Sequence, residues 1–443
     1  MSAHRGQWSS KLGFIFAAAG SAIGLGNIWR FPYIAGENGG AAFVFTYLIC
    51  VIAIGLPVML AELALGRATQ RNPVGAIETV HPGSLWKAVG ILGVLTGVAI
   101  LSYYAVIAGW TVGYMISSAI GRPLDFGSFV ADPMAMIFYQ ALFMIITIVV
   151  VSGGVEGGIE RWAKILMPML LVLLLILIIR SLTLDGAFKG LEFYLKPDFS
   201  KINYNVIIAA LGQAFFSLSL GMGTMMTYGS YLKKDDNAVA SGFQVALFDT
   251  MIAFMAGLLI FPALFAMGKD PAAGPGLVFQ VLPEIFKAMP LGNLFGALFF
   301  LLLAVAALTS TISLLEVPVA YFVDEKRWTR KKAVWTVGTA TFLVGIPSAL
   351  SLGANRFFSS IQFPLIHKTG FLDIMDFIWG NFSLALGALL LSIFVGWVWG
   401  ADRALAELRQ GAVDFSWQGE GWKYLIKIIC PVVIFVILLN LFI

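Results

Sequence analysis

Two apolar stretches of the chain combine glycines with side chains that carry oxygen or charge. The stretch SAIGLGNIWRFP runs from Ser21 to Pro32, and SLSLGMG runs from Ser217 to Gly223. Glycine and proline weaken helices, and Arg30 is costly to place in hydrocarbon. We therefore expect each stretch to interrupt a membrane helix near its middle.

A helix interrupted inside a membrane can bind ions. Its freed N–H and C=O groups cannot be satisfied by hydrocarbon. The C-terminal end of one half-helix offers carbonyls to a cation, and the N-terminal end of the other offers N–H groups to an anion. The residues alone indicate a zwitterion or anion bound together with a cation. Close packing of helices through small residues stays open as the alternative for either glycine pair.

The composition indicates the elements that hold these stretches. Of 443 residues, 59% are hydrophobic and 12% are charged, whereas soluble domains are about a quarter charged. Apolar runs of roughly 20 residues, long enough to cross a bilayer, recur along the chain. We expect eleven membrane spans near 11–36, 41–66, 88–120, 135–151, 163–182, 204–231, 239–268, 293–323, 333–352, 374–399 and 422–443.

The charges predict the orientation of these spans. Most of the 28 Lys and Arg residues fall in the connections on the side of the N-terminus. The positive-inside rule then places the N-terminus in the cytoplasm and, with an odd number of spans, the C-terminus outside. Two cysteines and three scattered histidines give no disulfide framework or metal site. The net charge of +4 needs no nucleic-acid partner, since basic loops at the membrane account for it.

A weak internal repeat relates the two glycine stretches. Gly24 and Gly26 lie near the middle of the first span, and Gly221 and Gly223 lie at the matching place in the sixth. Paired interruptions of this kind are typical of transporters built from inverted repeats. We expect an all-α membrane domain over 1–443, with repeats at about 11–182 and 204–399 and an extra helix at 422–443.

Five motifs in order resemble the neurotransmitter:sodium symporter family, in its bacterial amino-acid branch. They are GLGNIWRFP (24–32), ENGGAAF (37–43), GIERWAKILMP (158–168), GQAFFSLSLGMG (212–223) and LTSTIS (308–313). The resemblance covers nearly the whole chain. It implies a 5+5 inverted-repeat core with unwound helices 1 and 6, two sodium sites and uptake by alternating access. The chain departs from many relatives by ending after eleven spans instead of twelve.

The resemblance implies one sodium site between the first and eighth spans. Its ligands would be the carbonyls of Gly20, Ile23 and Ala306 and the hydroxyls of Thr309 and Ser310. A lone serine or threonine in a membrane helix more often bonds a carbonyl one turn back. This alternative is less favoured for Thr309 and Ser310, because both residues lie inside the motif LTSTIS.

A second implied sodium site joins the first, sixth and seventh spans. Its ligands would be the carbonyl of Ala22, the side chains of Asn27, Ser217 and Asp249, and one oxygen of the substrate carboxylate. Chloride-dependent relatives bind chloride near this site. Bacterial relatives often use instead a carboxylate one turn after the position of Asp249, where this chain has Ala253. We expect Asp249 to supply that negative charge itself and to make transport independent of chloride. The alternative is a protonated Asp249 that only forms hydrogen bonds and has no ionic role.

The implied substrate is an amino acid bound by the interrupted helices. Its carboxylate would meet the N–H groups of Leu25 and Gly26 and the hydroxyl of Tyr104, and its ammonium would meet the carbonyls near Ala22, Phe216, Ser217 and Ser219. The side-chain pocket would be lined by Ser21, Ile100, Phe216, Met222, Ser310 and Leu314. This lining holds no charge, and the thioether of Met222 can adapt to side chains of different size. We expect hydrophobic L-amino acids, aromatic ones included.

The resemblance also implies two gates. The outer gate would pair Arg30 with Asp376, assisted by Gln213. The inner gate would pair Arg5 with Asp324, sealed by Trp8.

Two further expectations concern single segments, and one carboxylate inside the eighth span stays unassigned. Glu62 should accept N–H groups from the unwound segments, whereas Glu316 has no assigned role. GIERWAKILMP should unwind near the inner end of the fifth span, because Pro168 removes a backbone donor.

Two other classes of protein compete with a symporter. A channel would need a continuous polar lining, whereas the polar groups here cluster at one level. A membrane-embedded enzyme would need a reactive constellation, and the dispersed histidines do not provide one. The sequence thus favours a non-enzymatic, sodium-coupled symporter in a bacterial plasma membrane.

Overall fold

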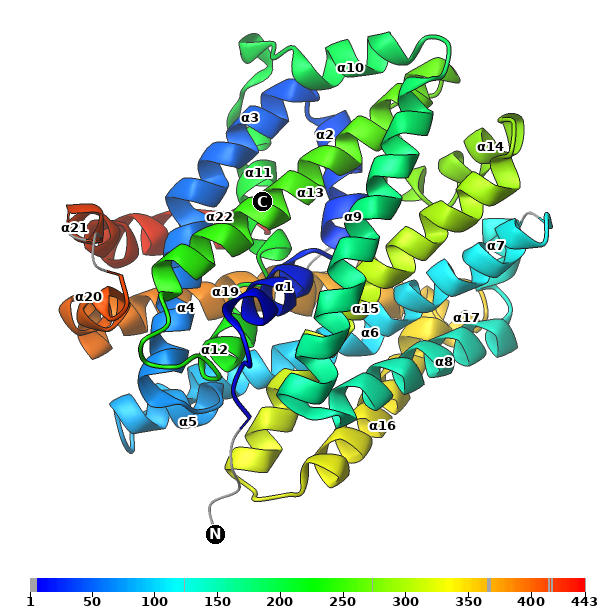
Figure 1. Cartoon of the computed structure of the whole chain (residues 1–443). Coiled ribbons are helices and arrows are strands. Elements are labelled where there is room, and N and C mark those ends of the chain that lie inside the picture. Colours follow the sequence, from blue (N-terminus) through cyan, green and yellow to red (C-terminus); the bar gives the residue numbers. More distant parts are fainter. Residues whose placement is uncertain are drawn as a thin grey trace.

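The computed structural model describes residues 6–122, 124–272, 274–364, 368–412, 415 and 417–442. The structure is built almost entirely of helices (Figure 1). The first five expected spans contain α1 (Lys11–Ala22), η1 (Gly26–Arg30), α2 (Phe31–Glu37), α3 (Ala41–Cys50), η2 (Val51–Gly55), α4 (Leu56–Thr69), α6 (Lys87–Ala119), α8 (Pro133–Ser152), η3 (Val155–Glu160) and α9 (Arg161–Leu182).

The second half of the chain contains a further series of helices. It contains α11 (Tyr204–Ser217), α12 (Thr224–Gly229), α13 (Ala238–Ala266), α15 (Gly292–Asp324), α16 (Arg330–Ala349), α18 (Phe371–Met375), η7 (Asp376–Ser383), α19 (Leu384–Ile393), η8 (Phe394–Gly400) and α20 (Ala401–Arg409). The chain then continues through α21 (Trp417–Tyr424), η9 (Leu425–Ile429) and α22 (Cys430–Asn440).

Short elements make the connections. They are α5 (Pro73–Val80), α7 (Phe126–Val130), α10 (Ala187–Leu195), η4 (Phe199–Lys201), η5 (Gly274–Leu277), α14 (Val281–Ala288) and α17 (Arg356–Ser360). Two antiparallel strands, β1 (Gln362–Phe363) and β2 (Lys368–Thr369), pair Gln362 with Thr369. We call the face that carries Trp8 and α5 the inner face, and the face that carries α10 and α14 the outer face.

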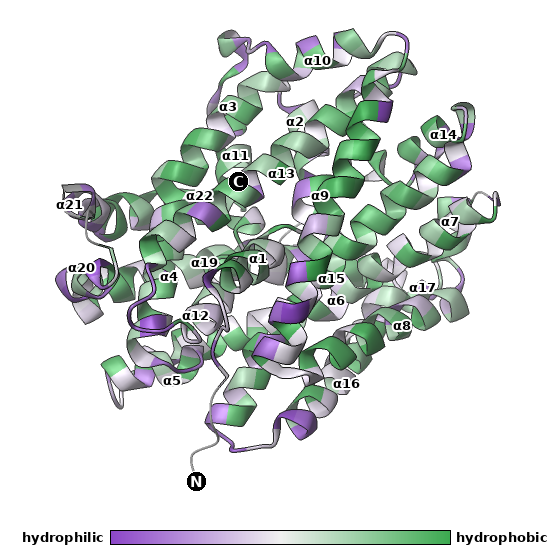
Figure 2. Ribbon diagram, viewed as in Figure 1, coloured by the Kyte–Doolittle hydropathy of each residue, from purple (hydrophilic) through white to green (hydrophobic). Residues whose placement is uncertain are grey.

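The expected spans coincide with helices in the described part of the chain. Eight helices there are long and apolar enough to cross a membrane, and the bent pair 11–22 and 26–37 makes nine. The sixth expected span corresponds to α11 and α12, which are separated by six residues, and the ninth to α16. Hydrophobic residues follow these helices, and hydrophilic residues gather in the connections and near the N-terminal segment (Figure 2).

The longest helices form the centre of the bundle. α6 and α15 pack along one another, and α1 packs against α9, α13 and α15. Both α6 and α15 are apolar around most of their circumference, which is typical of helices buried on all sides. Buried aromatic rings lie between the two helices: the rings of Tyr114 on α6 and Phe300 on α15 are tilted by 36° at a centroid distance of 4.8 Å. This packing leaves the broken helix α1–η1 enclosed by regular ones.

The fifth span differs from the expectation. Its backbone is helical from Val155 to Leu182, and Pro168 lies inside the regular helix α9. The expected unwinding is therefore wrong for this conformation. The irregularity takes another form, because Val155–Glu160 is a π-helix, a widened turn that often marks functional positions.

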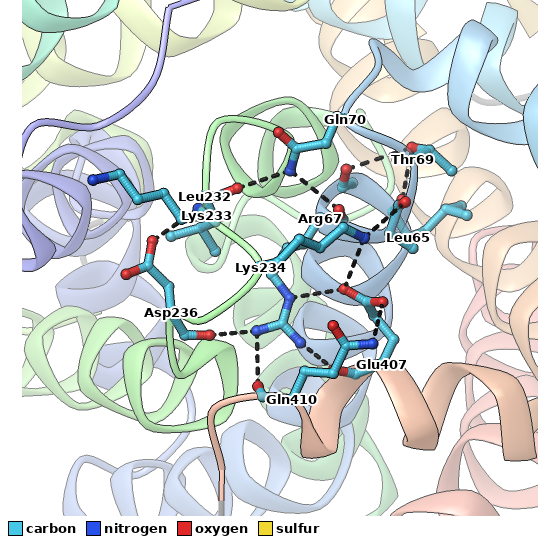
Figure 3. A network of polar contacts seen from close by, with 12 residues as sticks. Leu65, Arg67, Thr69, Gln70, Leu232, Lys233, Lys234, Asp236, Glu407 and Gln410 are labelled. Atoms are coloured by element: carbon cyan, nitrogen blue, oxygen red, sulfur yellow. Dashed lines mark hydrogen bonds and ion pairs between the residues drawn. The ribbon is translucent and has the colours of Figure 1, made fainter.

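A buried arginine ties three segments together at the inner face (Figure 3). Arg67, at the end of α4, is fully buried, and its Nε donates to Glu407 Oε1 at 2.9 Å. Its other nitrogens donate to the carbonyls of Asp236, Glu407 and Gln410. The guanidinium thus neutralises the carboxylate and also caps the last carbonyls of α20, where a positive charge is favourable.

Removing this guanidinium should destabilise the protein strongly. Arg67→Met leaves the Glu407 carboxylate, whose side chain is 9% exposed, with the exposed Lys234 at 3.5 Å as its charged partner. The loss of a buried partner costs up to about 3 kcal/mol when another charge stays nearby. We expect Arg67→Met to lower the midpoint of thermal unfolding in detergent by several degrees, whereas the matched variant Arg71→Met, at an exposed position, should not. Equal midpoints for the two variants would show that the network carries no stability.

Candidate functional site

The two expected helix interruptions are present and adjoin each other. Between α1 and η1 the chain bends by 50°. Between α11 and α12 it passes through Ser219, Gly221 and Gly223, all with positive φ. At Gly221 a side chain would also collide with a backbone carbonyl, since an added Cβ would lie 2.2 Å from Leu384 O. Ser219 Oγ donates to Ser21 O at 3.0 Å, which joins the two breaks.

A buried carboxylate satisfies part of the freed backbone. Glu62, on α4, accepts the N–H groups of Gly221 at 2.8 Å and Met226 at 3.2 Å, and it is completely buried. These donors belong to the break and to the first turn of α12, where a negative charge is favourable. The expectation for Glu62 is confirmed.

Oxygen atoms from α1 and α15 converge at the first expected sodium site. Thr309 Oγ1 lies 2.9 Å from Ala306 O and 3.3 Å from Ile23 O. Ser310 Oγ lies 3.5 Å from Ala306 O. Gly20 lies against Thr309, since an added Cβ would be 3.2 Å from Thr309 Cβ. A hydroxyl can rotate to turn its lone pairs toward an ion. The set consists of neutral hard oxygens, which fits an alkali cation.

The second expected sodium site surrounds the carboxylate of Asp249 on α13. Asn27 Nδ2 donates to Asp249 Oδ1 at 2.7 Å, and Ser217 Oγ lies 3.0 and 2.9 Å from its two oxygens. Tyr47 adds a longer contact of 3.3 Å. Asp249 is completely buried, and these described hydrogen-bond partners are all neutral. A buried carboxylate without a counter-ion is costly, so the donor set fits a cation that supplies the missing charge.

The transition-metal alternative has no support in the described residues. Within them no group of three His, Cys, Asp or Glu side chains is placed to hold a metal ion. The two oxygen clusters instead contain one carboxylate, hydroxyls, an amide and carbonyls. These hard ligands suit alkali and alkaline-earth cations.

A small cavity of about 30 Å³ lies between the two breaks and the helices α6, α15 and α19. Its walls include ten of the twelve expected substrate-binding residues: Ser21, Ala22, Gly26, Ile100, Tyr104, Phe216, Ser219, Met222, Ser310 and Leu314. Leu25 adjoins it, because its N–H donates to Tyr104 Oη at 2.9 Å. Ser217 adjoins it too, next to Phe216. None of the lining residues carries a charge.

Two lining residues were missed by sequence reasoning. Gly24 lines the cavity because an added Cβ would lie 2.4 Å from Ser310 Oγ and 2.8 Å from Tyr104 Oη. Its place in the glycine stretch was a usable signal. Leu384, at the start of α19, lines the opposite wall. An isolated leucine among many carries no such signal in the sequence.

The outer gate differs from the expected ion pair. In the described part of the chain no salt bridge joins Arg30 to Asp376; instead Arg30 Nη2 donates to Asn381 Oδ1 at 3.2 Å. Asn381 Nδ2 in turn donates to Asp376 Oδ2 at 3.2 Å, and Tyr103 Oη donates to Asp376 Oδ1 at 3.0 Å. The expected direct pair is therefore not formed in this conformation, because the Asn381 amide on the π-helix η7 lies between the charges.

The expected helper of the outer gate also has another partner. Gln213 Nε2 donates to the carbonyl of Gly26 at 2.8 Å, so Gln213 supports the interrupted backbone. Above it the guanidinium of Arg30 lies 4.5 Å from the ring centre of Phe216. Phe216 lines both the small cavity and a larger one of about 750 Å³ on the outer side, which Arg30, Asp376 and Asn381 also line. Phe216 thus separates the two spaces.

The inner side of the cavity is closed by aromatic packing. Trp8 Nε1 donates to Tyr228 O at 3.0 Å, and its ring contacts those of Tyr228 and Tyr231. Arg5 lies outside the described residues. Asp324, its expected partner, accepts the backbone N–H and the Nδ2 group of Asn72 at 3.0 and 3.2 Å.

The structure gives partners to Glu316, which the sequence left without a role. This fully buried carboxylate lies 2.6 Å from Arg330 Nη2 and accepts a hydrogen bond from Tyr231 Oη at 2.6 Å. Tyr231 contacts Trp8, so Glu316 connects α15 and α16 to the inner seal. No local sequence motif predicts this pairing, because Arg330 is only one of several basic residues around the start of α16.

Comparisons with known proteins agree along the whole chain. The Sodium:neurotransmitter symporter family matches residues 5–128 and 128–443. The sodium-dependent transporter YhdH of Bacillus subtilis is 42% identical, over 98% of this chain and 97% of that protein. The human sodium- and chloride-dependent GABA transporter 2 is 27% identical, over 90% of this chain and 74% of that protein.

A solved structure shares the fold. The crystal structure of MhsT in complex with L-phenylalanine matches with a TM-score of 0.90 and 47% identity, over 99% of this chain and 100% of that one. A match of this extent, together with the interrupted helices and the oxygen clusters beside them, leaves one assignment: the chain belongs to the sodium:neurotransmitter symporter family and is a multi-pass, sodium-dependent membrane transporter, not an enzyme.

Proposed function

We propose that the protein is a sodium-coupled symporter that imports hydrophobic L-amino acids, aromatic ones included, across a bacterial plasma membrane. The observation that carries this proposal is the uncharged cavity between two broken helices. Backbone groups at its polar end suit a carboxylate and an ammonium, while Ile100, Met222 and Leu314 offer an apolar wall. The MhsT structure contains L-phenylalanine, which is a ligand of this class.

The substrate's charged groups would bind at the helix ends. Its carboxylate would take the N–H groups of Leu25 and Gly26 and the hydroxyl of Tyr104, which lies 2.9 Å from Leu25 N. One carboxylate oxygen would then complete the sodium ligands around Ala22, Asn27, Ser217 and Asp249. Because ion and substrate share that oxygen, each raises the affinity for the other. This shared ligand would couple transport to the sodium gradient.

The two cavities support alternating access. The larger space on the outer side reaches Phe216, while Trp8 and its ring contacts close the inner side. A channel would need an open polar path through both faces. Phe216 would swing as the outer lid, and movement of α1 away from α9 and α15 would open the inner path. The N-terminus would lie in the cytoplasm and the C-terminus outside.

Asp249 supports chloride independence. Its buried carboxylate lies where Tyr47 and Ser217 also converge. An anion held here compensates the charge of an entering sodium ion. At 4 Å and an effective dielectric constant of about 20, a pair of unit charges is worth roughly 4 kcal/mol. A fixed carboxylate at this position would make a second, diffusible anion unnecessary.

Uptake into proteoliposomes tests the transport proposal. Radiolabelled L-phenylalanine should accumulate only when sodium is higher outside than inside, and unlabelled hydrophobic amino acids should compete while aspartate and lysine should not. Accumulation without sodium would rule out the symporter. Competition by charged amino acids as strong as by leucine would rule out the substrate class.

Changing the apolar wall tests the assigned pocket. Met222→Phe replaces a flexible thioether with a rigid ring, so it should weaken competition by L-tryptophan more than competition by L-leucine, by about tenfold or 1.4 kcal/mol. Met251→Phe, on α13 outside the cavity lining, is the matched control. If Met222→Phe weakened competition by L-tryptophan and by L-leucine equally, residue 222 would not select substrates by size.

Replacing chloride with gluconate tests the role of Asp249. Wild-type uptake should be unchanged, since the carboxylate supplies the negative charge. Asp249→Asn keeps the size and the amide oxygen but removes the charge, and its remaining uptake should require chloride. A wild-type protein that needs chloride would refute this role.

A further inference from the structure

The carboxylate of Glu160 joins the start of α1 to the π-helix η3. Ser9 donates to it twice, from its backbone N–H to Oε2 at 2.7 Å and from Oγ to Oε1 at 2.6 Å. Ser10 Oγ donates to Oε1 at 2.9 Å. Glu160 is 1% exposed. Two neighbouring serines of the N-terminal segment are thus held by one buried side chain of the fifth span.

The local sequence is arranged for this contact. Ser10 is also the N-cap of α1, and its Oγ accepts the N–H of Gly13 at 3.1 Å. The same hydroxyl therefore caps α1 and contacts Glu160 of η3. Gly13 allows the close approach, because an added Cβ would lie 2.0 Å from Glu160 Oε1. Lys164 Nζ lies 2.7 Å from the same oxygen, but its side chain is 39% exposed and remains hydrated. The carboxylate therefore takes donors from Lys164 on its own span and from two serines of the N-terminal segment, of which Ser9 is exposed and Ser10 is partly buried.

The same face of α9 leads from this contact to the first sodium site. Glu160, Ala163 and Met167 follow at the spacing of one helical face, and Ala163 is buried. Met167 lies against Gly20, whose added Cβ would be 3.2 Å from the Met167 sulfur and 3.2 Å from Thr309 Cβ. α1 packs against α9 along this line. Separating α1 from α9 would open a path from the inner face to the Thr309 oxygens.

We propose that Glu160 is a positioning residue that latches the inner end of α1 closed over the Thr309 site. The inference rests on the proposed sodium site, because that site is what the latch covers. The inner end of α1 cannot leave α9 without breaking the three hydrogen bonds from Ser9 and Ser10. Their loss in the open state is partly offset by water, so the latch biases the equilibrium and does not block it. Glu160 would act together with the aromatic seal around Trp8.

A purely structural ion pair is the competing explanation. In that case Glu160 would serve only to neutralise Lys164 within α9, and Ser9 would matter little. Lys164→Gln would then have the same effect as Glu160→Gln. The latch instead predicts that Ser9→Ala resembles Glu160→Gln, since Ser9 is not the N-cap and its replacement leaves the helix start intact.

The reactivity of a thiol at position 163 tests the latch. The reporter is Ala163→Cys in a full-length background carrying Cys50→Ala and Cys430→Ala, labelled from the inner face by a membrane-impermeant reagent in sodium. Glu160→Gln should raise the labelling rate about tenfold, and Ser9→Ala should raise it in the same direction by less. Glu156→Gln, at an exposed carboxylate of the same π-helix, is the matched control and should leave the rate unchanged.

Two results would overturn the latch. One is a rate for Glu160→Gln equal to that for Glu156→Gln. The other is an increase caused by Lys164→Gln but not by Ser9→Ala. Binding of radiolabelled L-phenylalanine to each variant reports folding, and if Glu160→Gln does not fold, Ser9→Ala decides alone. The proposed sodium site is tested separately, by whether sodium slows labelling of the thiol in the reporter background. A labelling rate that does not depend on sodium would refute the sodium site. The comparison of labelling rates between variants would still test the latch.

Discussion

The unpaired backbone of two broken helices is the constraint on which the rest of the structure depends. A membrane interior offers no water to N–H and C=O groups, so each break must be satisfied by protein, ion or substrate. Glu62 takes two N–H groups of the second break, Gln213 donates to Gly26 O in the first, and Ser219 bridges the two. Leu25 N donates to Tyr104 Oη beside the cavity, and we propose that the substrate carboxylate binds both groups.

The same constraint explains why ions and gates gather around α1. The helix supplies backbone carbonyls at Gly20, Ala22 and Ile23 for the two proposed sodium sites, and its inner end is held by weak, separable contacts. Trp8 packs on Tyr228 and Tyr231, and Ser9 donates to Glu160. In the proposed mechanism, the element that binds the ions is therefore also the element that moves. We infer that occupancy of the sites biases α1 toward its closed position, which is how ligands shift populations.

The fold followed from sequence because its signals are local: the expected apolar runs coincide with helices or broken helix pairs in the described part of the chain. The site residues followed from the resemblance of five motifs to the family, and ten of the twelve expected substrate-binding residues line one cavity. The contacts between side chains that are distant in the sequence were predicted less accurately. Asn381 stands between Arg30 and Asp376, and Glu316 finds Arg330 and Tyr231. Whether two such side chains pair depends on differences of a few ångströms in their positions. The spacing of residues along the chain does not predict these differences. Pro168 likewise lies inside the regular helix α9, at an exposed position.

The central claim is that substrate and sodium share an oxygen beside Asp249. The direct test is the equilibrium binding of radioactive sodium to purified protein, with and without saturating L-phenylalanine, together with the reciprocal titration. For the sodium site beside Asp249, linkage requires that phenylalanine raise the affinity for sodium by the same factor as sodium at this site raises the affinity for phenylalanine. We predict equal factors of about tenfold or more in the wild-type protein and a much smaller factor in Asp249→Ala. Sodium affinity that does not change with phenylalanine would contradict the account.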